Sequence, residues 1–111
     1  MVEHKYSVGD LVYIKQKNLI TVMELSYMDK GRTMLNYCGE PAIIIEKDIT
    51  YYFERNAPMY RVRFIDEVME HRQLRDSHDY RWCWLESMVT KNKEISVQGI
   101  KIKCVRGGKY E

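Results

Sequence analysis

The sequence predicts an all-β domain, a small barrel or sandwich, and two short segments carry most of that prediction. Residues 8–14 begin with the turn-forming pair Gly9 and Asp10 and continue into residues that suit a pleated, half-buried strand. Within residues 60–66, the apolar side chains of Tyr60, Val62 and Phe64 alternate with two arginines, as expected for a strand with one buried face. Small β-scaffolds of this kind bind other molecules more often than they catalyse reactions, so we expect a binding protein.

Bulk composition limits the chain to one ordinary domain. It has 111 residues, of which 45% are hydrophobic and 31% charged, which is typical of a folded globular protein. The formal net charge of +2 is too small to indicate nucleic-acid binding by itself. Because only two prolines occur and no segment is rich in Gly or Ser, residues 1–111 are expected to form a single domain without a linker.

Neither a membrane span nor a leader is visible. No stretch approaches the roughly 18 consecutive apolar residues of a spanning helix. The chain starts with Met1 and lacks the apolar core of a signal peptide, so we expect a cytoplasmic product. Three cysteines occur without paired spacing, and in a reducing compartment they are expected to be buried apolar side chains: Cys38, Cys83 and Cys104.

The first half of the chain reads as extended segments. Residues 5–15 form the first predicted strand. Residues 19–25 are ambiguous between a strand and a short helix, but the turn signal at residues 29–31 and the extended pattern at residues 33–38 favour a long hairpin over residues 19–38. Pro41 is expected to end that hairpin, because proline cannot donate a hydrogen bond to a ladder.

The middle of the chain predicts a central strand, a turn and another strand. Residues 42–47 contain the β-branched run Ile43 to Ile45 without alternation, which favours a central strand covered on both faces for part of its length. The sequence Asn56-Ala57-Pro58 predicts a turn. In the strand that follows, over residues 59–66, three side chains are expected to point inward and the two arginines between them outward. The inward set is Tyr60, Val62 and Phe64, and the outward set includes Arg61 and Arg63.

The second half contains a polar insertion and two further β-segments. Residues 67–79 are mostly charged and are expected to form either a wide loop or one or two turns of helix. Residues 80–85 alternate strictly, which predicts a strand with Tyr80, Trp82 and Trp84 on one face. Residues 90–105 are expected to form a C-terminal hairpin around Gly99, and residues 106–111 to fray.

The order of these segments resembles an SH3-like barrel of the KOW or Tudor type. The resemblance covers roughly residues 5–89. It rests on the segments Val8-Gly9-Asp10-Leu11-Val12, Ala42 to Glu46, Tyr60-Arg61-Val62-Arg63-Phe64 and Trp82 to Val89. Small bacteriophage proteins of uncharacterised function are similar. The resemblance implies an SH3-like barrel to which a long hairpin, the polar insertion and the C-terminal hairpin have been added.

The expected function is non-enzymatic protein binding. The sequence is compatible with a small phage-encoded protein that docks on a host or virion protein. Arginine and tyrosine are enriched at the centres of interfaces, and an exposed tyrosine is a better interface candidate than a buried tryptophan. The candidate contact residues are Tyr51, Tyr52, Arg61, Arg63, Arg72, Arg75 and Tyr80.

Two other functions compete with protein binding. The first is nucleic-acid binding through a basic strand face, with Lys101, Lys103 and Arg106 as contacts beside Arg61 and Arg63. Lysines on an edge strand also protect against aggregation, which is the structural alternative for the same residues. The second is a structural part of a virion. The aromatic residues allow either a stacking platform or simple burial in the core.

No motif indicates a metal, a cofactor, a small-molecule substrate or a reaction. His71, His78 and Cys83 lack the close pairs that zinc sites prefer, so no metal site is expected. Cys83 and His78 could form a nucleophile–base pair, but a cysteine between Trp82 and Trp84 is expected to be buried and inert. We therefore expect that the protein is not an enzyme.

Overall fold

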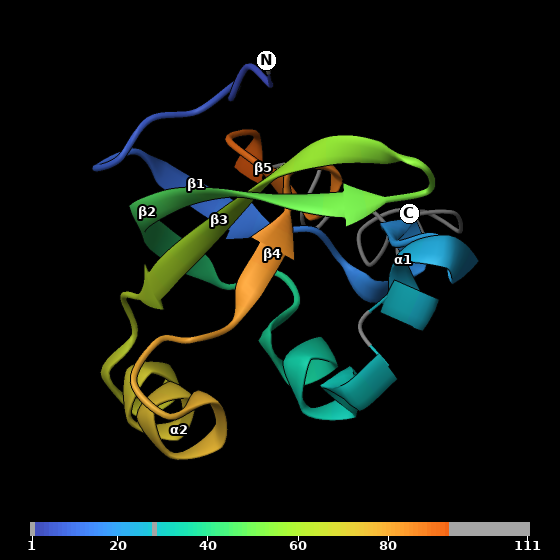
Figure 1. Cartoon of the computed structure of the whole chain (residues 1–111). Coiled ribbons are helices and arrows are strands. Elements are labelled where there is room, and N and C mark those ends of the chain that lie inside the picture. The colour runs from blue at the N-terminus through green and yellow to red at the C-terminus, as the bar shows by residue number, and fades with distance from the viewer. Residues whose placement is uncertain (1, 28, 94–111) are drawn as a thin grey trace, which may run out of the picture.

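A computed structural model describes residues 2–27 and 29–93 of the chain. In this part, the strands form one antiparallel sheet in the order β4-β3-β2-β1-β5 (Figure 1). The sheet is open, with β4 and β5 at its edges. The strands are β1 Leu11–Ile14, β2 Pro41–Tyr52, β3 Arg55–Phe64, β4 Cys83–Leu85 and β5 Val89–Thr90. The helices are α1 Val22–Tyr27 and α2 Glu67–Ser77, with 3-10 helices η1 Lys17–Leu19, η2 Asp29–Tyr37 and η3 Glu86–Met88.

The sheet-rich architecture is confirmed, and so is the alternation in β3. Tyr60, Val62 and Phe64 are fully buried, whereas Arg61 and Arg63 are half-exposed. The inward side chains pack in a core with residues from every strand and from η2 and η3. Its largest fully buried members are Trp84, Tyr37, Tyr60, Phe64, Ile14, Ile44, Leu85 and Met88.

The predicted hairpin over residues 19–38 is wrong, because this segment is helical. Thr21 and Glu24 form a reciprocal cap at the start of α1: the Glu24 N–H donates to the Thr21 hydroxyl at 3.1 Å, and Oε1 of Glu24 accepts from the Thr21 N–H at 2.7 Å. A threonine followed three residues later by glutamate is a helix-start signal. This local signal outweighs the β-branched content that favoured a strand.

The central strand is confirmed and is longer than predicted, but its expected coverage on both faces is wrong. Ala42 and Ile44 are buried on one face, whereas Ile45 on the other face is 37% exposed. β2 lies between β1 and β3, and it begins at Pro41, which pairs with Tyr13. Proline is tolerated as the first residue of a strand, so Pro41 starts β2 instead of ending a preceding hairpin. The predicted first strand, residues 5–15, shortens to β1. Gly9 has a φ of 95°, and this turn separates β1 from the N-terminal arm, residues 2–8.

The predicted turn at Asn56-Ala57-Pro58 is also wrong, since these residues lie inside β3. The turn is two residues earlier, at Phe53 and Glu54, and both have positive φ angles, 50° and 63°. Pro58 pairs with Ile49. In a hairpin with a two-residue loop, this pair is one whose backbone groups point away from the partner strand, so the missing proline N–H breaks no ladder bond.

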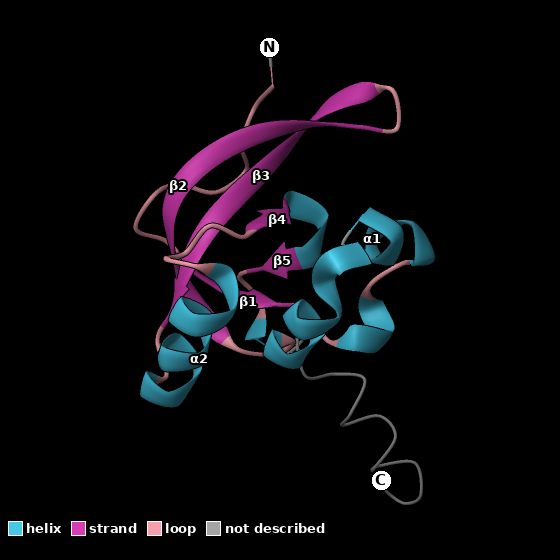
Figure 2. Cartoon of the chain, turned by 60° about the horizontal axis from the view of Figure 1, so that its bottom comes forward, coloured by secondary structure: helices cyan, strands magenta, loops and turns pink. Residues whose placement is uncertain are grey.

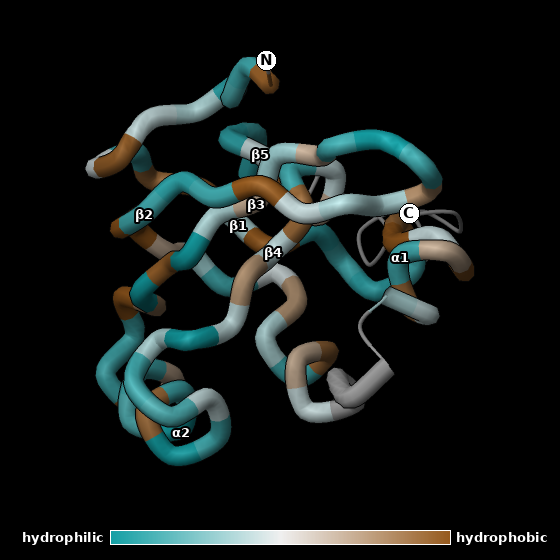
Figure 3. The backbone as a smooth tube through the Cα atoms, viewed as in Figure 1, coloured by the Kyte–Doolittle hydropathy of each residue, from teal (hydrophilic) through white to brown (hydrophobic). Residues whose placement is uncertain are grey.

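The polar insertion is a helix, three turns long instead of one or two. Asp66 caps α2, with Oδ2 accepting from the Met69 N–H at 3.0 Å. Gln73 is fully buried and ties α2 to β3: its Oε1 accepts from the Phe64 N–H at 3.1 Å, and its Nε2 donates to the Val62 carbonyl at 2.7 Å. Figure 2 shows α2 next to the lower end of β3, and in Figure 3 most of the backbone tube over α2 has the colour of hydrophilic residues.

The predicted strand over residues 80–85 begins only at Cys83. Tyr80 has a φ of 61°, a left-handed backbone conformation that no strand contains. The aromatic pair is divided, with Trp84 buried and Trp82 half-buried. Cys38 and Cys83 are free and half-buried, and burial raises the pKa of the Cys38 thiol to about 11. The C-terminal hairpin, the fraying tail and Cys104 lie outside the described residues.

Candidate functional site

The β2–β3 hairpin continues as a two-stranded ribbon beyond its neighbours in the sheet. β1 pairs with β2 only as far as Ile43, and β4 pairs with β3 only as far as Met59. β2 and β3 pair with each other out to Tyr52 and Arg55. We call residues 46–58 the hairpin end, and Figure 2 shows it reaching past β1, β4 and β5. The ribbon therefore presents backbone and side chains to the surroundings on more than one side.

Apolar side chains are exposed along the hairpin end. Tyr51 is 70% exposed and Phe53 60% exposed, and Ile49 is also exposed. Ile49 and Tyr51 share one face of β2 because side chains alternate along a strand. Tyr52 points to the other face, where its ring lies 5.4 Å from the ring of Tyr27 in α1. Of these two neighbouring tyrosines, Tyr51 is therefore exposed and Tyr52 is half-buried.

Contacts from outside the sheet support the ribbon. Such support is needed because an isolated two-stranded hairpin is only marginally stable in water. Besides Tyr27, the N-terminal arm contributes His4, whose Nε2 lies 2.7 Å from the Asp48 carbonyl. The Asp48 side chain accepts from the N–H of Ile49 at 2.8 Å, which covers one donor at the edge of β2. The hairpin end is therefore held in place while its apolar side chains stay exposed.

The five other predicted contact residues are mostly held in ion pairs, and four of them lie on α2 or contact it, whereas Arg61 contacts Glu46 of the hairpin end. Arg61 pairs with Glu46 at 3.4 Å, and Arg75 pairs with Asp76 at 3.1 Å. Glu70 gathers two of the predicted residues: its Oε2 lies 3.9 Å from Nη1 of Arg63 and 2.6 Å from the Tyr80 hydroxyl, which donates to it. Arg72 is exposed on α2. The predicted set is thus divided between the hairpin end and α2.

The basic face predicted for nucleic acid is only partly described. Arg61 and Arg63 are its described members, and each faces a glutamate. Lys101, Lys103 and Arg106 lie outside the described residues.

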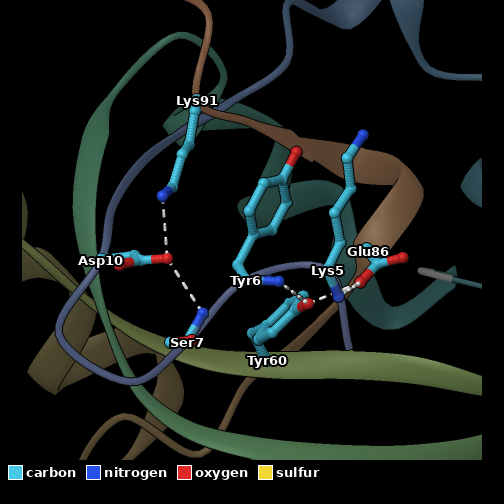
Figure 4. Close-up of polar contacts among 7 residues, drawn as sticks. All are labelled: Lys5, Tyr6, Ser7, Asp10, Tyr60, Glu86 and Lys91. Carbon is cyan, nitrogen blue, oxygen red and sulfur yellow. Dashed lines mark hydrogen bonds and ion pairs between the residues drawn. The ribbon is translucent and has the colours of Figure 1, made fainter. Parts of the chain in front are cut away.

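A second polar cluster, which the sequence did not predict, joins the N-terminal arm to η3 (Figure 4). Oε2 of Glu86 accepts from the Lys5 N–H at 2.7 Å and from the Tyr60 hydroxyl at 2.5 Å. Tyr60 Oη in turn accepts from the Tyr6 N–H at 3.0 Å. The ammonium groups of Lys5 and Lys91 lie 5.6 Å and 5.9 Å from the centre of the Tyr6 ring. Because these partners are up to 81 residues apart in the chain, no spacing motif could have revealed the cluster.

Lys91 also forms an ion pair with Asp10 at the turn before β1. Its ammonium lies 3.0 Å from Oδ2 of Asp10, which also accepts from the Ser7 N–H at 2.9 Å. Both interactions favour the ionised carboxylate, so they lower the pKa of Asp10, with the Ser7 N–H as the larger cause.

Two shallow hollows lie on either side of η3 and share Glu86 and Ser87 as wall residues. The first, of about 380 Å³, lies along β3 and is otherwise lined by Tyr52, Arg55, Asn56, Ala57, Pro58 and Leu85. The second, of about 310 Å³, lies beside the N-terminal arm and is otherwise lined by Lys5, Tyr6, Lys15, Val89 and Thr90. We call them the strand hollow and the lysine hollow.

The described part of the chain contains no group of three or more metal-ligating side chains. Within residues 2–27 and 29–93, no helix is long and apolar enough to cross a membrane. Comparison with known proteins found no matching family model, no matching curated sequence and no matching solved structure.

Proposed function

We propose that this protein is a non-enzymatic binding module that holds another protein on its hairpin end. The observation that carries the proposal is the two-stranded ribbon with exposed Ile49, Tyr51 and Phe53 beyond the rest of the sheet. Exposed aromatic side chains on a supported element supply large contact area at low entropic cost. Tyr51 and Tyr52 of the predicted contact set belong to this surface, and Phe53 and Ile49 are added to it.

The backbone of the hairpin turn supports the same proposal. Two-residue turns with positive φ favour Asn and Gly, and a side chain such as that of Phe53 or Glu54 costs roughly 1–2 kcal/mol per residue in this conformation. Strain of this kind tends to be retained where it serves a function. At the hairpin tip it keeps an aromatic ring exposed, where a stability-optimised turn would carry small polar residues.

We also propose that the domain is an SH3-like barrel, as the sequence resemblance implies. The strand order β4-β3-β2-β1-β5 and the 3-10 helix η3 between β4 and β5 support this assignment. The segment between β1 and β2 and the helix α2 would then be additions to a small scaffold. A small phage-encoded protein that docks on a host or virion protein fits this proposal.

Site-specific photo-crosslinking tests the proposed contact surface. A photoreactive phenylalanine analogue is placed at Phe53 and, as a matched control, at Val68, which is 59% exposed on α2. Each variant is irradiated in host lysate with and without nuclease treatment, and unlabelled wild-type protein serves as competitor. We expect one competable protein adduct from position 53 and none from position 68. Equal labelling from both positions would contradict the proposal, and an adduct lost on nuclease treatment would favour nucleic-acid binding.

A further inference from the structure

The outer edge of β3 has an unfilled strand position. β4 pairs with β3 from Arg61 to Met59, but after Leu85 the chain turns away into η3, whereas β3 continues back to Arg55. On this side, the described residues provide no strand partner for residues 55–58. The strand hollow occupies the place where β4 would have continued, with Leu85 at one end and Asn56 to Pro58 along its wall.

The backbone of β3 presents hydrogen-bonding groups to that hollow. In an antiparallel ladder, the backbone groups of successive residues point alternately to the two neighbouring strands. Tyr60 pairs with Trp84 of β4, and the hairpin turn sets the same alternation, so Pro58 and Asn56 also face the outer side. Pro58 contributes only a carbonyl, because proline has no N–H. Asn56 contributes both an N–H and a carbonyl.

The lysine hollow continues the site with positive charge. The side chains that line the two hollows include three cations, Arg55, Lys5 and Lys15, and one carboxylate, Glu86. That carboxylate already accepts from the Tyr60 hydroxyl and from the backbone N–H of Lys5. Figure 4 shows the Lys5 ammonium pointing away from Glu86. The lining is therefore complementary to a negatively charged segment.

We propose that the two hollows bind an extended acidic peptide segment of a partner protein. The segment would add to the sheet as a strand beside Asn56 and Pro58, and its acidic side chains would lie against Lys5 and Lys15. This inference rests on the proposed protein-binding function and adds the chemistry of the partner. The chain's own residues 94–111 fit poorly by charge, because they contain four lysines or arginines and two glutamates.

The binding test uses fluorescence anisotropy with a labelled peptide of about ten residues that alternates valine and glutamate, a pattern suited to strand addition. Two matched peptides serve as controls: one alternates valine and lysine, and the other keeps glutamate but carries N-methyl groups on alternate backbone nitrogens. We expect binding of the first peptide only, and weaker binding as salt rises from about 20 to about 200 mM, since exposed charge pairs are screened. Equal binding of the N-methylated peptide would overturn strand addition.

Protein variants test the two parts of the site separately. The double substitution Lys5→Ala/Lys15→Ala should weaken binding of the acidic peptide about tenfold, whereas Arg72→Ala/Arg81→Ala, with the same change in net charge outside the hollows, should leave it within about twofold. Asn56→Pro removes one N–H that faces the hollow and none that faces β2, so it should abolish binding. Equal effects of the two double substitutions would overturn the acidic chemistry.

The results also separate this inference from the proposed function. A protein adduct at position 53 without any binding of the acidic peptide would overturn the inference and leave the hairpin end as the contact surface. Peptide binding that depends on Lys5, Lys15 and Asn56 would support the inference, even when position 53 yields no adduct.

Discussion

Tyr60 and Glu86 are joined by a 2.5 Å hydrogen bond in which the hydroxyl donates to the carboxylate. The bond links the middle of β3 to η3, and because Tyr60 Oη also accepts from the Tyr6 N–H, it fixes the N-terminal arm as well. Burial, and then the hydrogen bond to Glu86, raise the pKa of Tyr60. One hydroxyl thus connects three segments that lie far apart in the sequence.

Removing this hydroxyl should destabilise the protein. Tyr60→Phe keeps the buried ring but leaves the Tyr6 N–H without its acceptor, so we expect a loss of about 1–3 kcal/mol in the free energy of unfolding. Urea denaturation measures the loss. Tyr51→Phe is the matched control, because that tyrosine is 70% exposed and should change stability by less than about 0.5 kcal/mol. Similar losses in both variants would show that the hydrogen bonds of Tyr60 contribute little.

Gln73 acts as a one-residue substitute for a neighbouring strand. Its amide satisfies the Phe64 N–H and the Val62 carbonyl, which face the outer edge of β3 past the last pair with β4. Gln73→Leu should leave both buried backbone groups without partners and cost roughly 2–4 kcal/mol by urea denaturation. Hydrogen exchange should show the loss locally, as faster exchange of the Phe64 amide.

The control for Gln73 is the neighbouring position on α2. Leu74 is 38% exposed, and Leu74→Gln changes side-chain polarity on the same helix while the two hydrogen bonds from Gln73 to β3 stay in place. We expect it to shift stability by less than about 0.5 kcal/mol. An unchanged rate of Phe64 amide exchange in Gln73→Leu would contradict the assigned role.

Sequence reasoning succeeded where one strong pattern determined the structure. The alternation of Tyr60, Val62 and Phe64 identified β3 and its buried face. Side chains alternate between the two faces of a strand, so in a sheet with one buried face the apolar set must point toward the core. The central position of residues 42–47 in the sheet followed from the β-branched run Ile43 to Ile45. Both features can be predicted from a few consecutive residues, and each determines how a whole strand is placed in the sheet.

Predictions were wrong where the meaning of a local sequence signal depends on which strand or segment the residue contacts in the fold. The sequence Asn56-Ala57-Pro58 predicts a turn, but a strand accepts proline where the backbone faces outward, and the pairing of Pro58 with Ile49 places it in such a position. The cluster around Glu86 had no sequence signal at all, because it depends on how the N-terminal arm crosses η3. The start of α1 does have a sequence signal, the spacing of Thr21 and Glu24, which is typical of a helix N-terminus.

The cap formed by Thr21 and Glu24 leads to a third prediction. Thr21→Ala removes the hydroxyl that accepts from the Glu24 N–H, and loss of such a cap costs about 1 kcal/mol. Thr21→Ser keeps an acceptor and should cost less than about 0.5 kcal/mol. Glu24→Ala should cost more than Thr21→Ala, because the buried Glu24 carboxylate also accepts from the Ser87 hydroxyl and so ties α1 to η3. Thermal denaturation of the three variants should reproduce this order, and any other order would contradict it.

Alkaline pH should destabilise the protein through buried tyrosines. Burial, and then a 3.1 Å hydrogen bond to Asp76, raise the pKa of Tyr37 to about 12. An unfolded tyrosine releases its proton near pH 10. The unfolded state therefore ionises first, so the stabilisation is fully present below about pH 10 and is lost as pH rises toward 12.

The measurement is the free energy of unfolding from pH 8 to pH 12, compared with Tyr37→Phe, which has no phenolic proton at that position. We expect the wild-type protein to lose stability more steeply than Tyr37→Phe above about pH 10. Parallel curves would show that Tyr37 titrates in the folded protein as it does in the unfolded chain.

The last prediction concerns the hairpin turn, where we expect that a more stable turn without the Phe53 ring binds the partner more weakly. Glu54→Gly relieves one positive φ and leaves Phe53 in place, so it should raise the free energy of unfolding by about 1 kcal/mol and keep partner binding. Adding Phe53→Asn creates the Asn-Gly pair that this turn favours, and stability should not fall below that of Glu54→Gly. The same change removes the exposed ring at the tip, so binding should fall at least tenfold. Retained binding in the double variant would show that Phe53 is not an anchor, and the strained turn would then need a structural explanation.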